Sequence, residues 1–168
     1  MTEKTEDVTV ELLDQVAAIA TAAGERLLAV YSTDSRPSTM AELMEVARRN
    51  ERVASGGLED ALHALRPDAR FVGDEEEASA LPDGEWWVVD DAEGSVNHVH
   101  GLAEWGVSIA LVVDGQPVLA VFRQPVADLT YTAVRGRGAR VNGQPLAVSR
   151  KEGLTIAIVG TGQAEAAQ

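Results

Sequence analysis

The chain has 168 residues, a formal net charge of −13 and a hydrophobic content of 45%. Its length suits one domain with a substantial core, so we expect residues 1–168 to form a single domain. The acidic balance argues against nucleic acid and membranes as partners, because no basic stripe is present to neutralise phosphates, and the absence of cysteine excludes disulfides and thiolate sites.

The first residues of the chain, "MTEKTEDVTVELL", are charged. They lack the basic region and the apolar core that make up a signal peptide. No run in the sequence approaches the apolar length of a membrane helix. We therefore expect a cytoplasmic protein.

The N-terminal part of the sequence is helical in pattern. Apolar residues recur at helical spacing from Thr9 to about Tyr31, and a second such pattern runs from about Met40 to Leu65. The glycines of "ASGG" (54–57) mark a candidate break in the second pattern, and Pro67 marks its end. We predict two N-terminal helices.

After about residue 70 the pattern changes to short β-branched runs separated by turns. The runs are "RFVG", "EWWVVD", "WGVSIALVVDG", "QPVLAVFRQP", "DLTYTAV", "ARVNGQPLAV" and "LTIAIVG". "RGRGAR" (135–140), the only basic cluster, is predicted to be a solvated hairpin turn. The order of elements predicts an α+β fold with the two helices packed on a mostly antiparallel sheet of about six strands.

One predicted strand, "VSIALVV" (107–113), is apolar at every position except Ser108. A strand with one wet face alternates apolar and polar residues, so this run predicts that both faces of the sheet are covered. Two helices cover one face only. We therefore expect a homodimer mate or a hetero-partner to cover the other face.

Two acidic clusters follow neighbouring predicted strands. "FVGDEEEA" places acids at 74–77, and "WWVVDDAEGS" places Asp90, Asp91 and Glu93 after the next strand. Converging carboxylates with a free carbonyl are ligands for a hard cation such as Mg²⁺, and Gly94-Ser95 offers N–H groups to an anion. The alternative is that both clusters are simply solvated loops.

The order of these motifs resembles the inositol monophosphatase family. The resemblance rests on the acidic pair followed by W-x-V-D-x-x-[acid]-G-[S/T]-x-N-x-x-H-G and by the strand-rich sequence to residue 149. It implies a layered αβαβα fold, of which this chain matches the first half, and Mg²⁺-dependent phosphomonoester hydrolysis. Family members continue into a second sheet, so the resemblance also implies a truncated chain.

The resemblance assigns roles by position. It implies that the metal is bound by Glu75, Asp90, the Ala92 carbonyl and Glu93. Ser95 would help to activate water, and the phosphate would lie on the N–H groups of Gly94 and Ser95. An upstream stretch of the family that touches the site falls on Arg48 and Glu51 here, and Glu51 keeps a carboxylate at a place where the family has one.

The metal motif is degenerate. Asp91 stands where the family has proline, Glu93 where it has aspartate, and Val96 where it has threonine. The longer Glu93 side chain moves a ligand oxygen by more than the ~0.5 Å that a preorganised site tolerates. Metal binding is therefore uncertain from sequence: the cofactor is either Mg²⁺ or none.

Three residues with aromatic rings lie in or just after the motif: His98, His100 and Trp105. His98 stands where the family usually has an aromatic residue and is a candidate proton carrier, with a solvent-facing position as the alternative. His100 occupies the family's H-G position, where we expect a structural hydrogen bond. Trp105 is expected to pack in the core, with lining of a substrate pocket as the alternative.

Three functions fit the sequence. The first is a repurposed small-molecule enzyme that uses the acidic cluster for acid–base chemistry of the cyclisation or isomerisation type. The second is an Mg²⁺-dependent phosphomonoesterase completed by a dimer mate or partner chain, and the third is a non-catalytic binding or assembly module. The candidate catalytic residues are Glu51, Glu75, Asp90, Glu93, Ser95 and His98.

Overall fold

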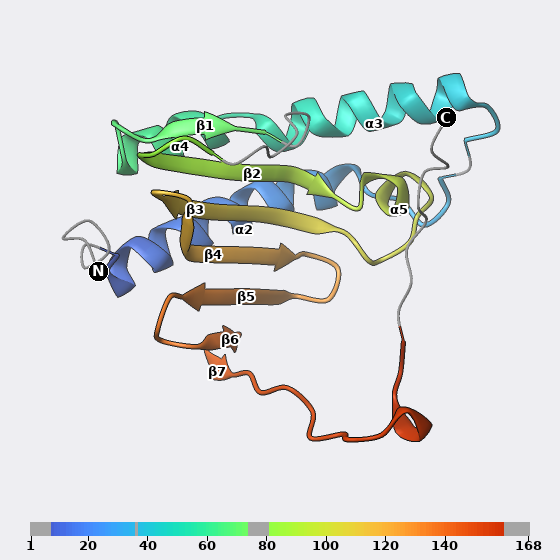
Figure 1. Cartoon of the computed structure of the whole chain (residues 1–168). Coiled ribbons are helices and arrows are strands. Elements are labelled where there is room, and N and C mark those ends of the chain that lie inside the picture. Colours follow the sequence, from blue (N-terminus) through green and yellow to red (C-terminus); the bar gives the residue numbers. More distant parts are fainter. Residues whose placement is uncertain (1–7, 36, 74–80, 160–168) are drawn as a thin grey trace.

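The computed structural model describes residues 8–35, 37–73 and 81–159 of the chain (Figure 1). The described helices are α2 (Val10–Val30), α3 (Met40–Ser55), α4 (Leu58–Leu65), α5 (Ser95–Val99) and the 3₁₀ helix η1 (Leu154–Ile156). None of them is long and apolar enough to cross a membrane.

One sheet of seven described strands carries the rest of the fold. Its strands are β1 (Arg70–Val72), β2 (Glu85–Glu93), β3 (Gly106–Val113), β4 (Gln116–Gln124), β5 (Leu129–Val134), β6 (Ala139–Val141) and β7 (Gln144–Pro145). They lie side by side in chain order; β1 pairs with β2 in parallel, and every other pair is antiparallel. The predicted α+β class and the mostly antiparallel sheet are confirmed.

Two details differ from the sequence prediction. The second helical pattern forms two helices, α3 and α4, because Gly57 adopts a left-handed conformation (φ 74°) that ends one helix and begins the next. The final run, "LTIAIVG", does not form a strand over its described residues: it contains the short helix η1 and is exposed. No neighbouring strand pairs with this segment in the described chain, so its backbone has no ladder to join.

The core lies between the helices and one face of the sheet. Helix α2 buries a stripe at helical spacing that includes Val16, Ala20 and Leu27, and it packs on β3 and β4. The Arg26 guanidinium donates to the Val53 and Ala54 carbonyls, which ties α2 to the end of α3. Each large aliphatic side chain buried here stabilises the fold by about 1.5–3 kcal/mol.

The two faces of the sheet are buried to different degrees. Along β3, Val107, Ile109 and Leu111 are buried, while Ser108 and Ala110 between them are half-buried. The helices lie on the first face, as Figure 1 shows for α2 behind the sheet. The described helices reach one face only, as expected, and the cover of the other face by a partner stays a prediction.

Candidate functional site

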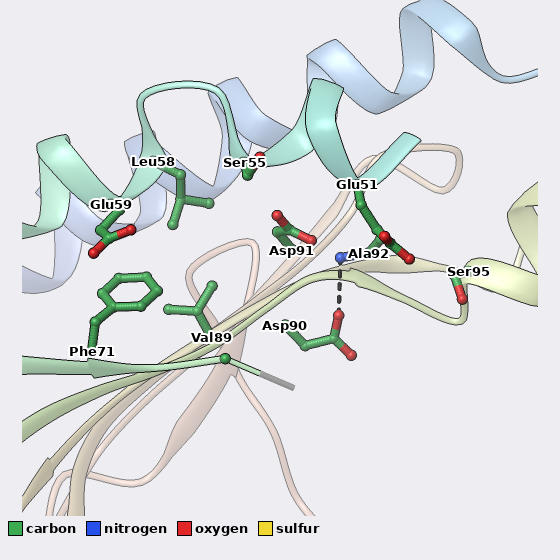
Figure 2. Close-up of a pocket in the computed structure, with 11 residues that line it drawn as sticks. Glu51, Ser55, Leu58, Glu59, Phe71, Val89, Asp90, Asp91, Ala92 and Ser95 are labelled. Atoms are coloured by element: carbon green, nitrogen blue, oxygen red, sulfur yellow. Dashed lines mark hydrogen bonds between the residues drawn. The ribbon is translucent and has the colours of Figure 1, made fainter. Parts of the chain in front are cut away.

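A cavity of about 270 Å³ lies where β1 and β2 end beneath α3 and α4 (Figure 2). We call it the acid pocket. Its lining residues are Glu51, Ser55, Leu58, Glu59, Phe71, Gly73, Val89, Asp90, Asp91, Ala92 and Ser95. Four of them carry carboxylates and two carry hydroxyl groups, and the apolar members form one wall. The described lining includes no lysine or arginine.

A break in the β2–β3 register sets the direction of the acidic side chains. Asp90 pairs with Ser108 and Glu93 pairs with Gly106, so two residues of β2 lie opposite Val107 alone. Such a bulge twists a strand and redirects its side chains. In Figure 2, Asp91 points toward Ser55 on α3, whereas Asp90 points to the other side, where its Oδ1 accepts a hydrogen bond from the Ala92 N–H at 2.9 Å.

The turn after β2 requires glycine. Gly94 has a left-handed backbone (φ 74°), and a Cβ at this position would lie 2.8 Å from the Glu104 carbonyl oxygen. A larger residue would therefore meet both strain and a backbone contact. The turn begins α5 and places Ser95 in the lining of the acid pocket.

The predicted site residues divide into two groups. Glu51, Asp90, Ala92 and Ser95 come together in the acid pocket. Glu93 is exposed and Gly94 is half-buried, and neither lines the pocket; Glu75 lies outside the described residues. Trp105 is 2% exposed, so it packs in the core as expected and does not line the pocket.

Sequence reasoning missed three polar residues of the pocket as site members: Ser55, Glu59 and Asp91. Ser55 follows Glu51 by four residues, and residues at that spacing lie on one face of a helix. This spacing could have indicated that Ser55 lies beside Glu51 at the site. Asp91 belongs to the acidic cluster that the sequence shows after the predicted strand, but the family resemblance gives no role to this position, so Asp91 is absent from the candidate site residues.

The predictions for His98 and His100 need correction. His98 is buried, with 4% of its surface exposed, so the solvent-facing position is wrong. Its ring bonds to Asn50 and to the Leu27 carbonyl and does not line the acid pocket, which gives no support to a proton carrier there. His100 is exposed. The structural hydrogen bonding expected of His100 is found instead at His98, because the turns of α5 direct that residue inward.

The described residues contain only three of the four predicted magnesium donors, because Glu75 lies outside them. Within residues 8–35, 37–73 and 81–159, no three His, Asp or Glu side chains form a group that would hold a metal ion. Glu93, one of the four donors, is exposed outside the pocket. We therefore derive no reaction step through a metal.

Comparison with known proteins places these features in a family. A model described as the inositol monophosphatase family matches residues 9–168. An inositol-1-monophosphatase of Rhizobium meliloti is 37% identical over 116 residues, which are 68% of this chain and 42% of that protein. A histidinol-phosphatase of Chlorobaculum parvum is 34% identical over 127 residues, 75% of this chain and 46% of that protein.

Solved structures show the same fold. The extragenic suppressor protein SuhB from Bartonella henselae superposes with a TM-score of 0.65 at 27% identity, over 84% of this chain and 55% of that one. An inositol monophosphatase II from Staphylococcus aureus superposes with a TM-score of 0.67 at 23% identity, which supports the fold alone. The chain spans about half the length of the relatives it matches.

Proposed function

The chain belongs to the inositol monophosphatase family, and from that premise we propose that the acid pocket is the active site of an enzyme acting on a small organic molecule by acid–base chemistry. The observation that carries the proposal is that four residues with carboxylates, Glu51, Glu59, Asp90 and Asp91, line one cavity. The reaction class we favour is proton transfer next to a carbonyl or hydroxyl group, as in an isomerisation or cyclisation.

The electrostatics of the pocket select among substrates. Carboxylates without a lysine or arginine in the described lining repel a phosphate group unless a cation neutralises them. They attract an amine and tolerate neutral hydroxyl groups. The apolar side chains of Leu58, Phe71 and Val89 offer a wall for the carbon skeleton. We therefore infer a neutral or amine-bearing substrate of a few carbon atoms.

Deuterium exchange tests this function without knowledge of the natural substrate. The protein is incubated in D₂O with a panel of small hydroxyketones and aminoketones, and incorporation next to the carbonyl is followed by NMR. We expect the Asp90→Asn and Asp91→Asn variants to lose about 100-fold or more of the rate, the size of a general-base contribution. Asp60→Asn, on the exposed side of α4 and outside the pocket, is the matched control.

Failure of this test is easy to recognise. Incorporation no faster than in buffer for every member of the panel overturns the acid–base proposal for that substrate class. Equal rates for the wild type and the Asp90→Asn, Asp91→Asn double variant overturn the assignment of these residues.

Phosphomonoester hydrolysis with Mg²⁺ is the second candidate, and a specific observation favours it. Asp90, Ala92 and Ser95, three positions to which the family resemblance gives a role, line the same cavity. Two of the relatives are named as phosphatases of inositol phosphate and histidinol phosphate. The test is phosphate release from inositol 1-phosphate and from 4-nitrophenyl phosphate, with and without Mg²⁺.

Glu93→Gln separates the two candidates. Glu93 lies outside the pocket, so acid–base chemistry at Asp90 and Asp91 proceeds unchanged in this variant. Mg²⁺-dependent hydrolysis requires the Glu93 carboxylate as a metal donor and is lost. Phosphate release at the buffer rate with Mg²⁺ present removes the second candidate.

We also propose that a second copy of this chain covers the open face of the sheet. Val88, Ala110 and Ala120 lie in register across that face and are half-buried, as are Val112 and Phe122 beside them. Large apolar residues are also exposed along residues 148–159: Val148, Leu154, Ile156, Ile158 and Val159. We expect a dimer by sedimentation at micromolar concentration, and a monomer overturns this proposal.

A further inference from the structure

Asn50 and His98 are the only buried polar residues in the described part of the chain, and they bond to each other. Asn50, on α3, is 2% exposed, and its Nδ2 lies 2.9 Å from Nδ1 of His98 on α5. His98 Nε2 lies 3.1 Å from the Leu27 carbonyl oxygen of α2. We call these three residues the histidine bridge. It joins three helices that lie far apart in the sequence.

The partners of the ring favour one neutral tautomer. The Leu27 carbonyl only accepts, so Nε2 carries the hydrogen, and Nδ1 accepts a hydrogen from the Asn50 amide. Burial lowers the pKa of His98 from its ordinary value of 6.5; the Leu27 hydrogen bond opposes this effect, and the Arg49 charge adds to it. The ring is therefore neutral at physiological pH.

The bridge also satisfies the end of α2. The Tyr31 N–H bonds to the Leu28 carbonyl, one residue short of the regular helical partner, Leu27. The Leu27 carbonyl is thus available to accept from His98. A second hydrogen bond, from the Tyr31 hydroxyl to the Gly101 carbonyl at 2.9 Å, joins the same helix end to the residues that follow α5.

The histidine bridge involves the same two helices, α3 and α5, that contribute Glu51 and Ser95 to the acid pocket. Asn50 is followed by Glu51, which lines the pocket from α3, and His98 lies one helical turn after Ser95, which lines it from α5. The His98 ring also packs edge-on against Trp105, with 4.6 Å between ring centroids. Any rotation of α5 that breaks the bridge therefore moves Ser95 relative to Glu51.

We propose that His98 is a positioning residue, whose neutral ring holds the Ser95 and Glu51 walls of the acid pocket at a fixed separation through Asn50 and Leu27. The use of the pocket as an active site rests on the proposed function; the positioning itself does not. The charged or titratable groups that face His98 are Tyr31 from the end of α2, Asp34 from the following loop and Arg49 from α3.

Asparagine suits this place better than an apolar residue. The Asn50 Oδ1 is buried and has no hydrogen-bond partner among the described residues. If His98 gained a proton, Nδ1 would become a donor, and rotation of the Asn50 amide would bring Oδ1 to meet it. Asn50→Leu removes both arrangements and leaves Nδ1 unpaired, so it is the second variant of the test.

The first measurement uses the wild-type protein. We expect ¹⁵N NMR at about pH 7.5 to show the His98 ring neutral, with hydrogen on Nε2 and Nδ1 as a hydrogen-bonded acceptor. A ring with hydrogen on Nδ1 alone, or a charged ring at this pH, overturns the proposal. This measurement depends neither on catalysis nor on the folding of a variant.

The second measurement is amide hydrogen exchange of residues 95–101 compared with that of β3. We expect exchange in 95–101 to rise about tenfold in His98→Phe and in Asn50→Leu, with β3 unchanged, because local opening becomes easier. His98→Gln, which keeps a donor for Leu27 and an acceptor for Asn50, restores the wild-type rates. Wild-type rates in His98→Phe overturn the proposal.

These outcomes are distinguishable from a failure of the proposed function. If deuterium incorporation fails for every substrate while the exchange results hold, the acid–base function falls and the positioning stands. If incorporation succeeds and His98→Phe leaves both exchange and turnover unchanged, the positioning role falls and the function stands.

Discussion

The acid pocket and the histidine bridge both use α3 and the chain from 90 to 98. They differ in how far their polar side chains are buried. In the pocket, Glu51 and Glu59 are exposed and Asp90 and Asp91 half-buried. In the bridge, His98 and Asn50 are almost wholly buried, and both ring nitrogens have partners. Carboxylates that reach solvent can meet a ligand, whereas a buried, hydrogen-bonded pair stabilises the fold.

The largest effect is expected on the bridge side, from Trp105→Ala. Trp105 is 2% exposed and packs against both Tyr31 and His98. Removal of such a side chain costs about 3–5 kcal/mol of unfolding free energy, measured by urea denaturation. Trp86→Ala is the matched control, because Trp86 is half-buried beneath the Arg70 guanidinium and should cost less. Equal losses of unfolding free energy in the two variants would show that Trp105 is packed no better than Trp86.

The pocket side could be anticipated from the sequence because its residues follow a local pattern. A buried run that ends in Asp90 and a glycine turn at Gly94 indicates a loop that presents polar groups, and the structure places Asp90, Ala92 and Ser95 in one cavity. The alignment with the upstream stretch of the family predicts Glu51 as a site residue. Ser55 follows Glu51 by four residues, so helical spacing alone would have placed it on the same face of the helix.

The bridge side could not be anticipated, because it depends on contacts between distant segments. His98 bonds to Leu27, 71 residues away, and to Asn50, 48 residues away. Nothing in the sequence around either partner shows which face of α5 turns inward. The register shift between Asp90 and Glu93 cannot be anticipated for a related reason: such a bulge is a property of two paired strands.

The next effect in size tests the turn between the two regions. Gly94→Ala places a Cβ 2.8 Å from the Glu104 carbonyl oxygen and keeps a left-handed φ of 74°. Gly57→Ala is a matched control with the same φ and no atom within 4 Å of the new Cβ. We expect a loss of about 1 kcal/mol for Gly57→Ala and about 2–3 kcal/mol for Gly94→Ala in urea unfolding. A Gly94→Ala loss no larger than that of the control would show that the Glu104 backbone yields easily.

A smaller effect should appear as pH dependence of stability. Burial lowers the pKa of His98 below 6.5, so below pH 6.5 the unfolded chain binds more protons than the folded chain. The free energy of unfolding is therefore full above about pH 6.5 and falls as the pH drops toward the folded pKa. Urea titrations from about pH 5 to about pH 8 measure the slope.

The slope has a direct control. His98→Phe should lose the part of the slope that His98 contributes, whereas His63→Gln should keep it, because His63 is exposed on α4. The carboxylates contribute equally to both variants. A slope that survives in His98→Phe would mean that another group carries the pH dependence.

The smallest effect is expected in the acid pocket, from Glu59→Gln. Glu59 is exposed and lies in a chain of net charge −13, so its charge contributes weak repulsion and its side chain little packing. We expect the free energy of unfolding to stay within about 0.5 kcal/mol of the wild type, with a small gain if any, and the gain to shrink in high salt. A loss above about 1 kcal/mol would contradict the contrast between the two regions, because it would mean that a solvated pocket acid supports the fold as a buried group does.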